Sequence, residues 1–271
     1  MSPDKPKQLF LSLVIPCYKQ QQTIVANVKQ LLSVLDEIRY SYEIIVVVDG
    51  EVDKSFEVLD AAKLHNTTVF AYKTNRGKSY AIRYGMRQAA GEHVMFLDAG
   101  MEIDPDGISM LLEHMKWYDA DIIVGSKRHL ASYVEYTFQR KILSLGYYYF
   151  VKLLFGIGVK DTQAGIKVFK KNVVAKILPR LVEKRFAGDL EMLVVAKQLG
   201  FDRIFEAPIK LDYGLGKLSS AATWKQILLI FIDTIAIYYR TYFLYYYNQP
   251  HKKTNPPNSV RTKRFKHKKK Y

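Results

Sequence analysis

Three short apolar runs decide the fold of this chain: LFLSLVIP at residues 9–16, YEIIVVV at residues 42–48 and HVMFL at residues 93–97. Each run has the length and composition of a strand that is buried on both faces. Between the first two runs, residues 23–35 carry apolar side chains at helical spacing: Ile24, Val28, Leu31, Leu32 and Leu35. A buried strand, a helix and a second buried strand predict a parallel sheet with right-handed crossovers.

The same alternation continues along the chain. We predict further helices at residues 55–64, 79–90 and 108–118, and further strands at residues 68–72 and 121–125. The chain has 271 residues, of which 49% are hydrophobic, which is enough for one sizeable α/β core. We therefore expect one doubly wound, mostly parallel, Rossmann-like domain over residues 1–220.

A polar cluster follows each predicted strand. The clusters are Cys17-Tyr18, Asp49-Gly50-Glu51, Asn75-Arg76-Gly77-Lys78, Asp98-Ala99-Gly100 and Ser126-Lys127-Arg128. In open α/β sheets the ligand binds beyond the carboxyl ends of the strands, so all five clusters should share one rim. Each cluster alone is also compatible with ordinary turn chemistry. Carboxylates mixed with Lys and Arg on one rim favour a phosphorylated ligand held through a metal and cations.

Seven motifs carry a resemblance to a known family. They are VIPCY (14–18), VVDGEVDKS (47–55), NRGKSYAIRYGM (75–86), FLDAG (96–100), GSKR (125–128), DTQAGIKVF (161–169) and RFAGDLEML (185–193). In this order and spacing the chain resembles family 2 glycosyltransferases, and most of all their dolichol-phosphate (polyprenyl-phosphate) glucosyl- and mannosyltransferase branch. The resemblance implies a GT-A-like fold and an inverting transfer of a hexose. The donor would be a nucleotide-sugar, UDP-glucose-like or GDP-mannose-like, and the acceptor a polyprenyl or dolichyl phosphate.

The resemblance also implies where the nucleotide binds. Pro16, Tyr18 and Asp49 would surround the base and ribose, and Arg76 and Lys78 would lie near the base edge or the phosphates. A solvated turn is the alternative for the last two residues. The family often has two acids at the end of the second strand, whereas this chain has Val48 before Asp49.

The metal motif departs from the family pattern. An Asp-x-Asp pair usually bridges Mg²⁺ or Mn²⁺ to the diphosphate, and here Gly100 stands at the second acid. Asp98 remains, and Glu102 stands where this branch can supply a further ligand. Hard cations accept water and phosphate oxygens, so two carboxylates can suffice. We predict a metal site at Asp98 and Glu102. Weakened metal binding or an altered cation is the main alternative, and an inactive homologue is a further one.

Further residues are implied around the acceptor and the reacting centre: Lys127, Arg140 with Ser144, Asp161 with Gln163, Asp189 with Glu191, and Lys217. Among them Lys127, Arg140 and Asp189 would act in catalysis together with Asp98. Arg140, Ser144, Asp161, Gln163 and Lys217 would hold the acceptor. Asp161 as the cap of a turn and Asp189 as the cap of a helix at residues 190–199 are the structural alternatives.

Two aromatic-rich segments suggest contact with a membrane. Residues 227–247 are long enough to span a bilayer, but Asp233 and Arg240 interrupt them. Residues 144–155 are a second aromatic segment of this kind, and aromatic residues favour the headgroup boundary. We interpret both as interfacial helices, and residues 221–248 as an amphipathic membrane-interface segment. Packing on the edge of the sheet is the alternative.

The charge of the chain is concentrated at its end. Residues 251–271 hold nine of the Lys and Arg residues and no acid, while the formal net charge of the whole chain is +15. We expect residues 249–271 to be a basic disordered tail that binds an anionic membrane surface. A nucleic-acid arm and a solubilising tail are the alternatives; nucleic acid is not the expected partner. The single cysteine and the missing apolar signal near Met1 favour a peripheral enzyme on the cytoplasmic face of a membrane.

The class of acceptor bears on the mechanism. A phosphate monoester has a second pKa of about 6 and is mostly dianionic at neutral pH, so it needs no strong general base. A sugar hydroxyl would need a base, and Asp189 is the candidate in the sequence. A Gln-x-x-Arg-Trp motif of processive synthases and a Gly-rich loop of nucleotidyltransferases are both absent from the sequence. A sugar-hydroxyl acceptor and a non-catalytic membrane-bound homologue remain the alternatives.

Overall fold

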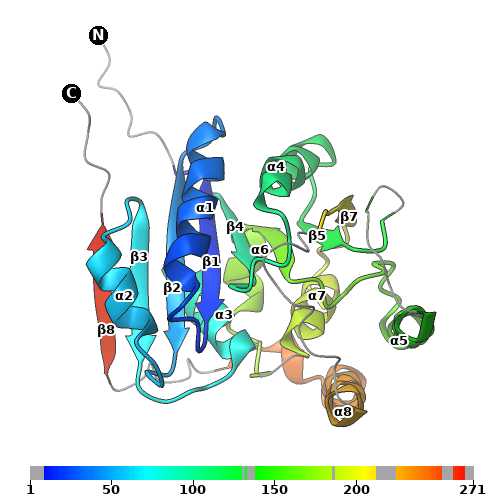
Figure 1. Cartoon of the computed structure of the whole chain (residues 1–271). Coiled ribbons are helices and arrows are strands. Elements are labelled where there is room, and N and C mark those ends of the chain that lie inside the picture. Colours follow the sequence, from blue (N-terminus) through cyan, green and yellow to red (C-terminus); the bar gives the residue numbers. More distant parts are fainter. Residues whose placement is uncertain are drawn as a thin grey trace.

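One mixed sheet organises the chain. The computed structural model describes residues 9–129, 132, 138–184, 187–211, 224–251 and 259–265. Within them the strands are β1 (Leu11–Cys17), β2 (Tyr42–Asp49), β3 (Thr67–Tyr72), β4 (His93–Leu97), β5 (Ile122–Ser126), β6 (Ile166–Lys170), β7 (Ile204–Pro208) and β8 (Val260–Phe265). Their order in the sheet is β7-β5-β6-β4-β1-β2-β3-β8 (Figure 1). β4, β1, β2 and β3 run parallel, as do β5 and β7, whereas β6 and β8 run antiparallel to their neighbours.

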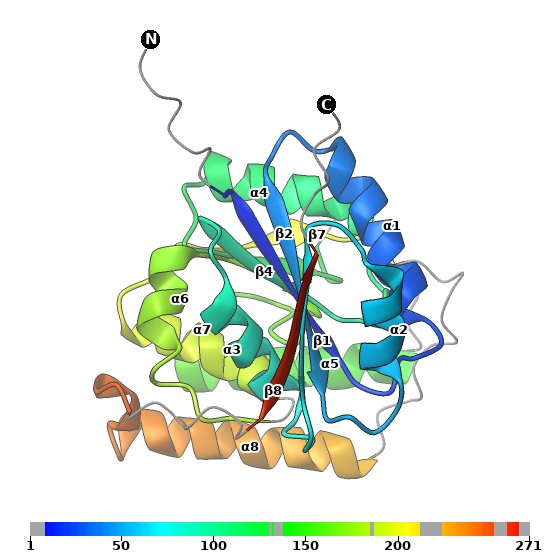
Figure 2. The same cartoon turned by 90° about the vertical axis from the view of Figure 1, so that its left-hand side faces the viewer.

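Helices cover both faces of this sheet. They are α1 (Ile24–Glu37), α2 (Ser55–Ala62), α3 (Lys78–Gln88), α4 (Ile108–Trp117), α5 (Phe138–Phe155), α6 (Lys171–Ile177), α7 (Gly188–Gln198) and α8 (Trp224–Tyr242). Figure 2 shows α1 and α2 on one side of the strands and α3, α6 and α7 on the other. The expected doubly wound α/β architecture is therefore confirmed.

Both faces of the central strands are buried, as the apolar runs predict. In β1, Leu13 and Ile15 join the core under α1, α2 and α4, while Val14 joins the core under α3, α6 and α7. The side chains of a strand alternate between the two faces of its sheet, so a continuous apolar run fills two cores at once.

The predicted disordered tail is wrong for residues 260–265. They form β8, which pairs antiparallel with β3 from Val260 opposite Tyr72 to Phe265 opposite Thr67. Arg261 donates to Glu51 at 2.8 Å and to Glu57 at 2.9 Å, and the Nζ atom of Lys263 lies 3.5 Å from Asp60. The charge count treats these cations as unpaired, but the carboxylates of α2 and the preceding loop neutralise them. β3 would otherwise leave a row of backbone hydrogen-bonding groups open.

The two aromatic segments form helices α5 and α8, which pack against each other. The Phe231 ring of α8 lies 5.5 Å from the Tyr147 ring and 5.2 Å from the Phe150 ring. Thr234 and Ile237 are buried, whereas Leu228, Ile232, Ile235 and Tyr239 of the same helix are more than half exposed. Among the described residues, no helix combines the length and apolarity that a bilayer crossing needs.

Candidate active site

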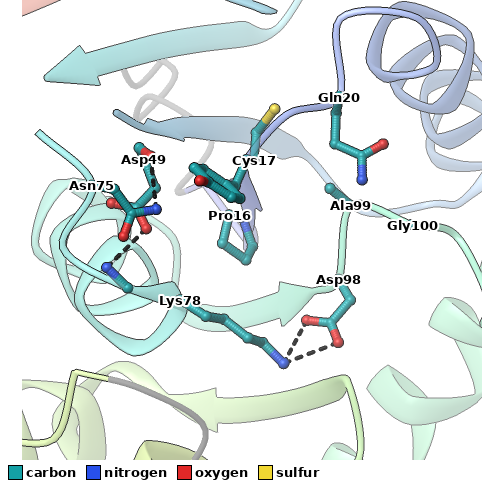
Figure 3. A pocket seen from close by; sticks show the side chains of 11 residues that line it. Pro16, Cys17, Gln20, Asp49, Asn75, Lys78, Asp98, Ala99 and Gly100 are labelled. Atoms are coloured by element: carbon teal, nitrogen blue, oxygen red, sulfur yellow. Dashed lines mark hydrogen bonds and ion pairs between the residues drawn. The ribbon is translucent and has the colours of Figure 1, made fainter. Parts of the chain in front are cut away.

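A cavity of about 450 Å³ opens where β1, β2 and β4 end. Its lining comes from those strand ends and from the start of α3: Pro16, Cys17, Tyr18, Gln20, Asp49, Asn75, Gly77, Lys78, Asp98, Ala99 and Gly100. Four of the five polar clusters predicted to share one rim contribute to this lining, which brings Pro16, Tyr18, Asp49, Lys78 and Asp98 around one space (Figure 3). The fifth cluster, Ser126-Lys127-Arg128, is not part of the lining. The volume suits a small polar ligand.

Asp49 at the end of β2 organises one side of the cavity. Its buried carboxylate accepts hydrogen bonds from the Tyr72 hydroxyl at 2.9 Å, the Arg76 backbone N–H at 2.7 Å and the Gly77 backbone N–H at 2.9 Å. Gly77 has a φ of 96°, in the region that favours glycine. Two of these three hydrogen bonds therefore hold the loop that starts α3 in place.

Arg76 turns away from this carboxylate. Its guanidinium donates to the Tyr80 hydroxyl at 3.1 Å and lies 5.0 Å from the centre of that ring. The predicted contact of Arg76 with the base or the phosphates stays a prediction. In the structure the side chain supports the first turn of α3.

Two lysines and two aspartates form a chain of charges beside the cavity. The Nζ atom of Lys78 contacts Asp98 Oδ1 at 2.8 Å and Oδ2 at 2.9 Å, and Asp189 Oδ2 at 3.5 Å (Figure 3 shows the first pair). The Nζ atom of Lys167 contacts Asp189 Oδ1 at 3.0 Å and the Ala164 carbonyl oxygen at 2.7 Å. Asp189, predicted to lie near the reacting centre, is thus held between two ammonium groups.

Burial lowers the pKa of each lysine and nearby carboxylates raise it, but the net direction differs between Lys78 and Lys167. Burial lowers the pKa of Lys78, but the carboxylates of Asp189 and Asp98 outweigh it and leave that pKa raised. Lys167 is fully buried, and there burial outweighs Asp189, so the pKa of Lys167 is lowered. Lys78, which reaches the cavity, is the firmly charged member of the pair.

The residues present fit a divalent cation poorly. Within the described part of the chain, no group of three or more His, Cys, Asp or Glu side chains could hold a metal ion. Both oxygens of Asp98 already face the Lys78 ammonium, Gly100 has no side chain, and Glu102 is exposed. Asp49 lies on another side of the cavity from Asp98 in Figure 3. We therefore assign no catalytic role to a bound metal ion at this site.

Two of the residues predicted to hold the acceptor, Asp161 and Gln163, make hydrogen bonds to other parts of the chain. Asp161 accepts a hydrogen bond from the Lys127 backbone N–H at 3.2 Å, and burial raises the pKa of Asp161. This matches the turn-capping alternative for Asp161. Gln163 donates to the Tyr147 hydroxyl at 3.3 Å, which lies 3.0 Å from the Thr234 hydroxyl of α8. Gln163 therefore contacts α5 directly and α8 through the Tyr147 hydroxyl.

Two predicted acceptor residues lie on α5. Ser144 is exposed on this helix, and the backbone of Arg140 belongs to it while the Arg140 side chain lies outside the described residues. Lys217 also lies outside the described residues. The Arg140–Ser144 pair and Lys217 stay predictions.

Glu191 does not face the cavity, contrary to its predicted place near the reacting centre. Its buried carboxylate accepts hydrogen bonds from the backbone N–H groups of Val182 and Glu183 and from the Tyr247 hydroxyl at 2.9 Å. Burial raises the pKa of Glu191 to about 7. Glu191 thus ties the loop before α7 to the segment after α8.

Lys167 is a site residue that was not predicted from the sequence. The signal was present, because a lysine in the apolar strand IKVF needs a buried partner. That partner, Asp189, lies 22 residues away on another element. Charge inside a buried strand could have identified Lys167 as a site residue, although not the aspartate that it contacts.

The chain is similar in sequence to known glycosyltransferases. The profile of Glycosyl transferase family 2 matches residues 12–178. A dolichyl-phosphate beta-glucosyltransferase of Drosophila melanogaster is 32% identical over 83% of this chain and 73% of its own. Its namesakes from Dictyostelium discoideum and Homo sapiens are 29% and 30% identical over 70% and 69% of this chain. The alignments span 63% of each of these two relatives.

Solved structures share the architecture at low sequence identity. Glucosyl-3-phosphoglycerate synthase of Mycobacterium tuberculosis, in complex with Mn²⁺, UDP-glucose and phosphoglyceric acid, gives a TM-score of 0.62 at 13% identity over 84% of this chain and 79% of its own. Mannosyl-3-phosphoglycerate synthase of Rubrobacter xylanophilus gives 0.65 at 12% identity over 92% and 79%. These likenesses show the GT-A-like fold. The profile match and the curated relatives establish that the chain belongs to the family 2 glycosyltransferases.

Proposed function

We propose that this enzyme transfers glucose from a nucleoside diphosphate sugar to a polyprenyl or dolichyl phosphate at a membrane surface. The contacts of Asp189 are the observation that favours a phosphate as the acceptor. Its oxygens lie 3.0 Å from the Lys167 Nζ atom and 3.5 Å from the Lys78 Nζ atom. Both oxygens of this buried carboxylate face ammonium groups, and Asp189 is not among the residues that line the cavity, so it is poorly placed to take a proton from a sugar hydroxyl. A phosphate acceptor needs no proton removed, whereas a sugar hydroxyl does.

The reaction follows from these charges. An oxygen of the acceptor phosphate attacks the anomeric carbon of the sugar, and the bond from that carbon to the diphosphate oxygen breaks. The nucleoside diphosphate leaves with the electron pair, and the anomeric configuration inverts. The developing negative charge on the leaving diphosphate is what the site must stabilise. Lys78, at the mouth of the charge chain, is the described cation that lines the cavity.

The donor and the acceptor approach from different elements. We assign the cavity at Pro16, Tyr18 and Asp49 to the nucleoside. The relatives named as glucosyltransferases favour glucose, and the UDP-glucose complex of the Mycobacterium synthase favours a uridine donor over a GDP-mannose-like one. The acceptor phosphate is assigned to the α5 side, where Arg140 and Ser144 lie and Gln163 meets Tyr147.

The aromatic helices are proposed as the membrane contact. Exposed apolar side chains gather on α5 and α8: Leu145, Tyr149, Leu153, Leu228, Ile232, Ile235, Tyr239 and Tyr242. In Figure 1 the arrowheads of β1 and β2 point toward the end of the molecule at which α8 lies. A lipid phosphate held at the headgroup level would then meet the strand ends that line the donor cavity. The cytoplasmic face of the membrane stays a prediction.

A donor and acceptor panel tests this function. The full chain is incubated with UDP- and GDP-sugars, and with polyprenyl phosphate or the matching polyprenol in detergent. We expect lipid-extractable hexose with UDP-glucose and polyprenyl phosphate, and none with polyprenol. Transfer to the free alcohol at a comparable rate would support the sugar-hydroxyl type of acceptor. Arg140→Ala should raise the KM for polyprenyl phosphate and leave hydrolysis of the sugar donor almost unchanged, since a guanidinium pairs bidentately with phosphate.

A further inference from the structure

We propose that Lys78 and the first turn of α3 bind the donor's diphosphate in this enzyme, in the place where a divalent cation would otherwise act. This inference rests on the proposed use of a nucleoside diphosphate sugar. It concerns the poor fit of a metal to the residues of this particular chain.

The carboxylate oxygens of the described residues that line the cavity are poorly suited to bind a metal ion. Two carboxylates line the cavity, those of Asp49 and Asp98. Asp49 accepts three hydrogen bonds from its own neighbourhood, and Asp98 is paired with Lys78 through both oxygens. Mg²⁺ requires near-octahedral oxygen ligands and is usually held by one or two carboxylates together with substrate phosphates. A metal here would have to displace an ammonium group 2.8 Å from its main ligand.

The charge balance of the site also changes when the second acid is replaced by glycine. Lys78, Lys167, Asp98 and Asp189 carry two positive and two negative charges, so the chain of contacts is neutral. A second aspartate at position 100 would make it negative, and a diphosphate could then approach only with a cation to offset that charge. With Gly100 the four-residue chain of contacts stays neutral, so no cation is needed to offset a second aspartate there.

The start of α3 supplies a second attraction for an anion. Gly77 and Lys78, the N-cap and first residue of α3, both line the cavity. The first backbone N–H groups of a helix have no partners within it and carry a partial positive charge. Asp49 fixes this turn by accepting the N–H groups of Arg76 and Gly77. A fixed helix start with a lysine at its first position is an arrangement that binds phosphate elsewhere.

Gly100 offers a gain-of-function test. A side chain at this position would meet no atom within 4 Å, and its φ is not in the positive range. Gly100→Asp should therefore fold normally while it restores the pair of acids. Lys78→Met removes the proposed cation, and Lys73→Met is the matched control, because Lys73 is an exposed lysine five residues earlier.

The experiment measures the binding of UDP, GDP and UMP to the full chain by calorimetry, in EDTA, Mg²⁺ and Mn²⁺. Bound Mn²⁺ is followed separately by electron paramagnetic resonance. We expect UDP to bind the wild type in EDTA within about threefold of its affinity in Mn²⁺. Lys78→Met should weaken UDP by at least about tenfold, and UMP by much less, since UMP lacks the second phosphate that the lysine is proposed to contact. Lys73→Met should bind like the wild type. Gly100→Asp should need Mn²⁺ to bind UDP and should retain Mn²⁺.

The outcomes separate this inference from the proposed function. Metal-dependent UDP binding by the wild type, or equal losses of UDP and UMP in Lys78→Met, would overturn the inference and leave the glycosyltransferase reaction in place. If neither UDP nor GDP binds under any condition, the proposed donor is wrong and the inference falls with it. Should Lys78→Met fail to fold, the comparison of Gly100→Asp with the wild type still decides.

Discussion

Lys167 is a fully buried lysine whose burial must be compensated by its neighbours. Its side chain is fully buried on β6, and its Nζ atom has Asp189, the Ala164 carbonyl oxygen and the Phe96 ring, 5.1 Å away, as neighbours. A buried ammonium is tolerated only when it is paired and hydrogen-bonded. Asp189 therefore lies between Lys167, which is buried in the core, and Lys78, which lines the cavity.

Removing Lys167 should therefore destabilise the fold through the charge left behind on Asp189. We expect Lys167→Met to lower the free energy of unfolding by about 3–5 kcal/mol, the usual effect of breaking a buried pair. The double variant Lys167→Met with Asp189→Leu should lose less than the sum of the two single variants. Urea denaturation of the wild type and the three variants measures this cycle. Additive losses would show that the 3.0 Å contact carries no coupling.

Glu191 should make stability depend on pH. Burial raises its folded-state pKa to about 7 from an ordinary value of 4.5, so the folded state binds more protons than the unfolded state between these values. The stabilising contribution is complete below the unfolded pKa and is lost as pH rises through 7. From pH 5 to 8, we expect the wild type to lose roughly 1–3 kcal/mol relative to Glu191→Gln. Parallel stability curves for the two proteins would contradict this.

Among the elements, β8 has the weakest sequence signal and a large structural role. VRTKRF has four polar side chains in six residues, and its partner strand β3 lies about 190 residues earlier in the chain. β8 covers the edge of β3, with Val260 and Phe265 packed against the two cores. The carboxylates that pair with Arg261 and Lys263 are distant in the sequence, and the pairing of β8 with β3 brings them close.

Deleting residues 259–271 should destabilise the domain, whereas deleting residues 266–271 should not. The first deletion exposes the β3 edge and two apolar side chains, which we expect to cost about 2 kcal/mol and lower the Tm by roughly 5 °C. Differential scanning calorimetry compares both truncations with the full chain. If the longer deletion leaves the Tm unchanged, the pairing of β8 with β3 contributes nothing to stability.

The elements that the sequence predicted well are those with a strong apolar period. The helix predicted at residues 23–35 became α1 (Ile24–Glu37), and the strand predicted at residues 93–97 has those bounds. The antiparallel strand β6 was not predicted, since IKVF contains a lysine whose partner is distant in sequence. The cavity residues Asp49 and Asp98 could be predicted, because strand ends share a rim. Their partners could not, because side-chain pairing depends on how the helices pack.

At the scale of the whole molecule, α8 and α4 lie at opposite ends (Figures 1 and 2). The ends differ in chemistry. α8 exposes Leu228, Ile232, Ile235 and Tyr239, each more than half accessible, while the α4 end exposes Trp117, 86% accessible, beside the exposed Tyr118. Single exposed apolar residues are common, whereas a continuous apolar surface marks an interaction site.

This difference predicts the orientation of the enzyme on a bilayer. Leu228→Glu combined with Ile232→Glu should weaken binding to phosphatidylcholine–phosphatidylserine vesicles by at least about tenfold, because each buried aliphatic side chain contributes about 1.5–3 kcal/mol. Trp117→Glu is the control at the far end and should bind as the wild type does. Co-sedimentation at high salt isolates the apolar part of the attachment. Equal loss in both variants would rule out α8 as the docking element.

The central claim is that the enzyme joins a hexose to a lipid phosphate, and ³¹P nuclear magnetic resonance tests it directly. The full chain receives UDP-glucose with equal amounts of polyprenyl phosphate and polyprenol, so that both acceptors compete in one sample. We predict that the phosphomonoester signal of the lipid is replaced by a phosphodiester signal as UDP appears in equal amount, with the polyprenol unchanged. UDP released while the lipid phosphomonoester persists and polyprenol becomes glucosylated would contradict the account.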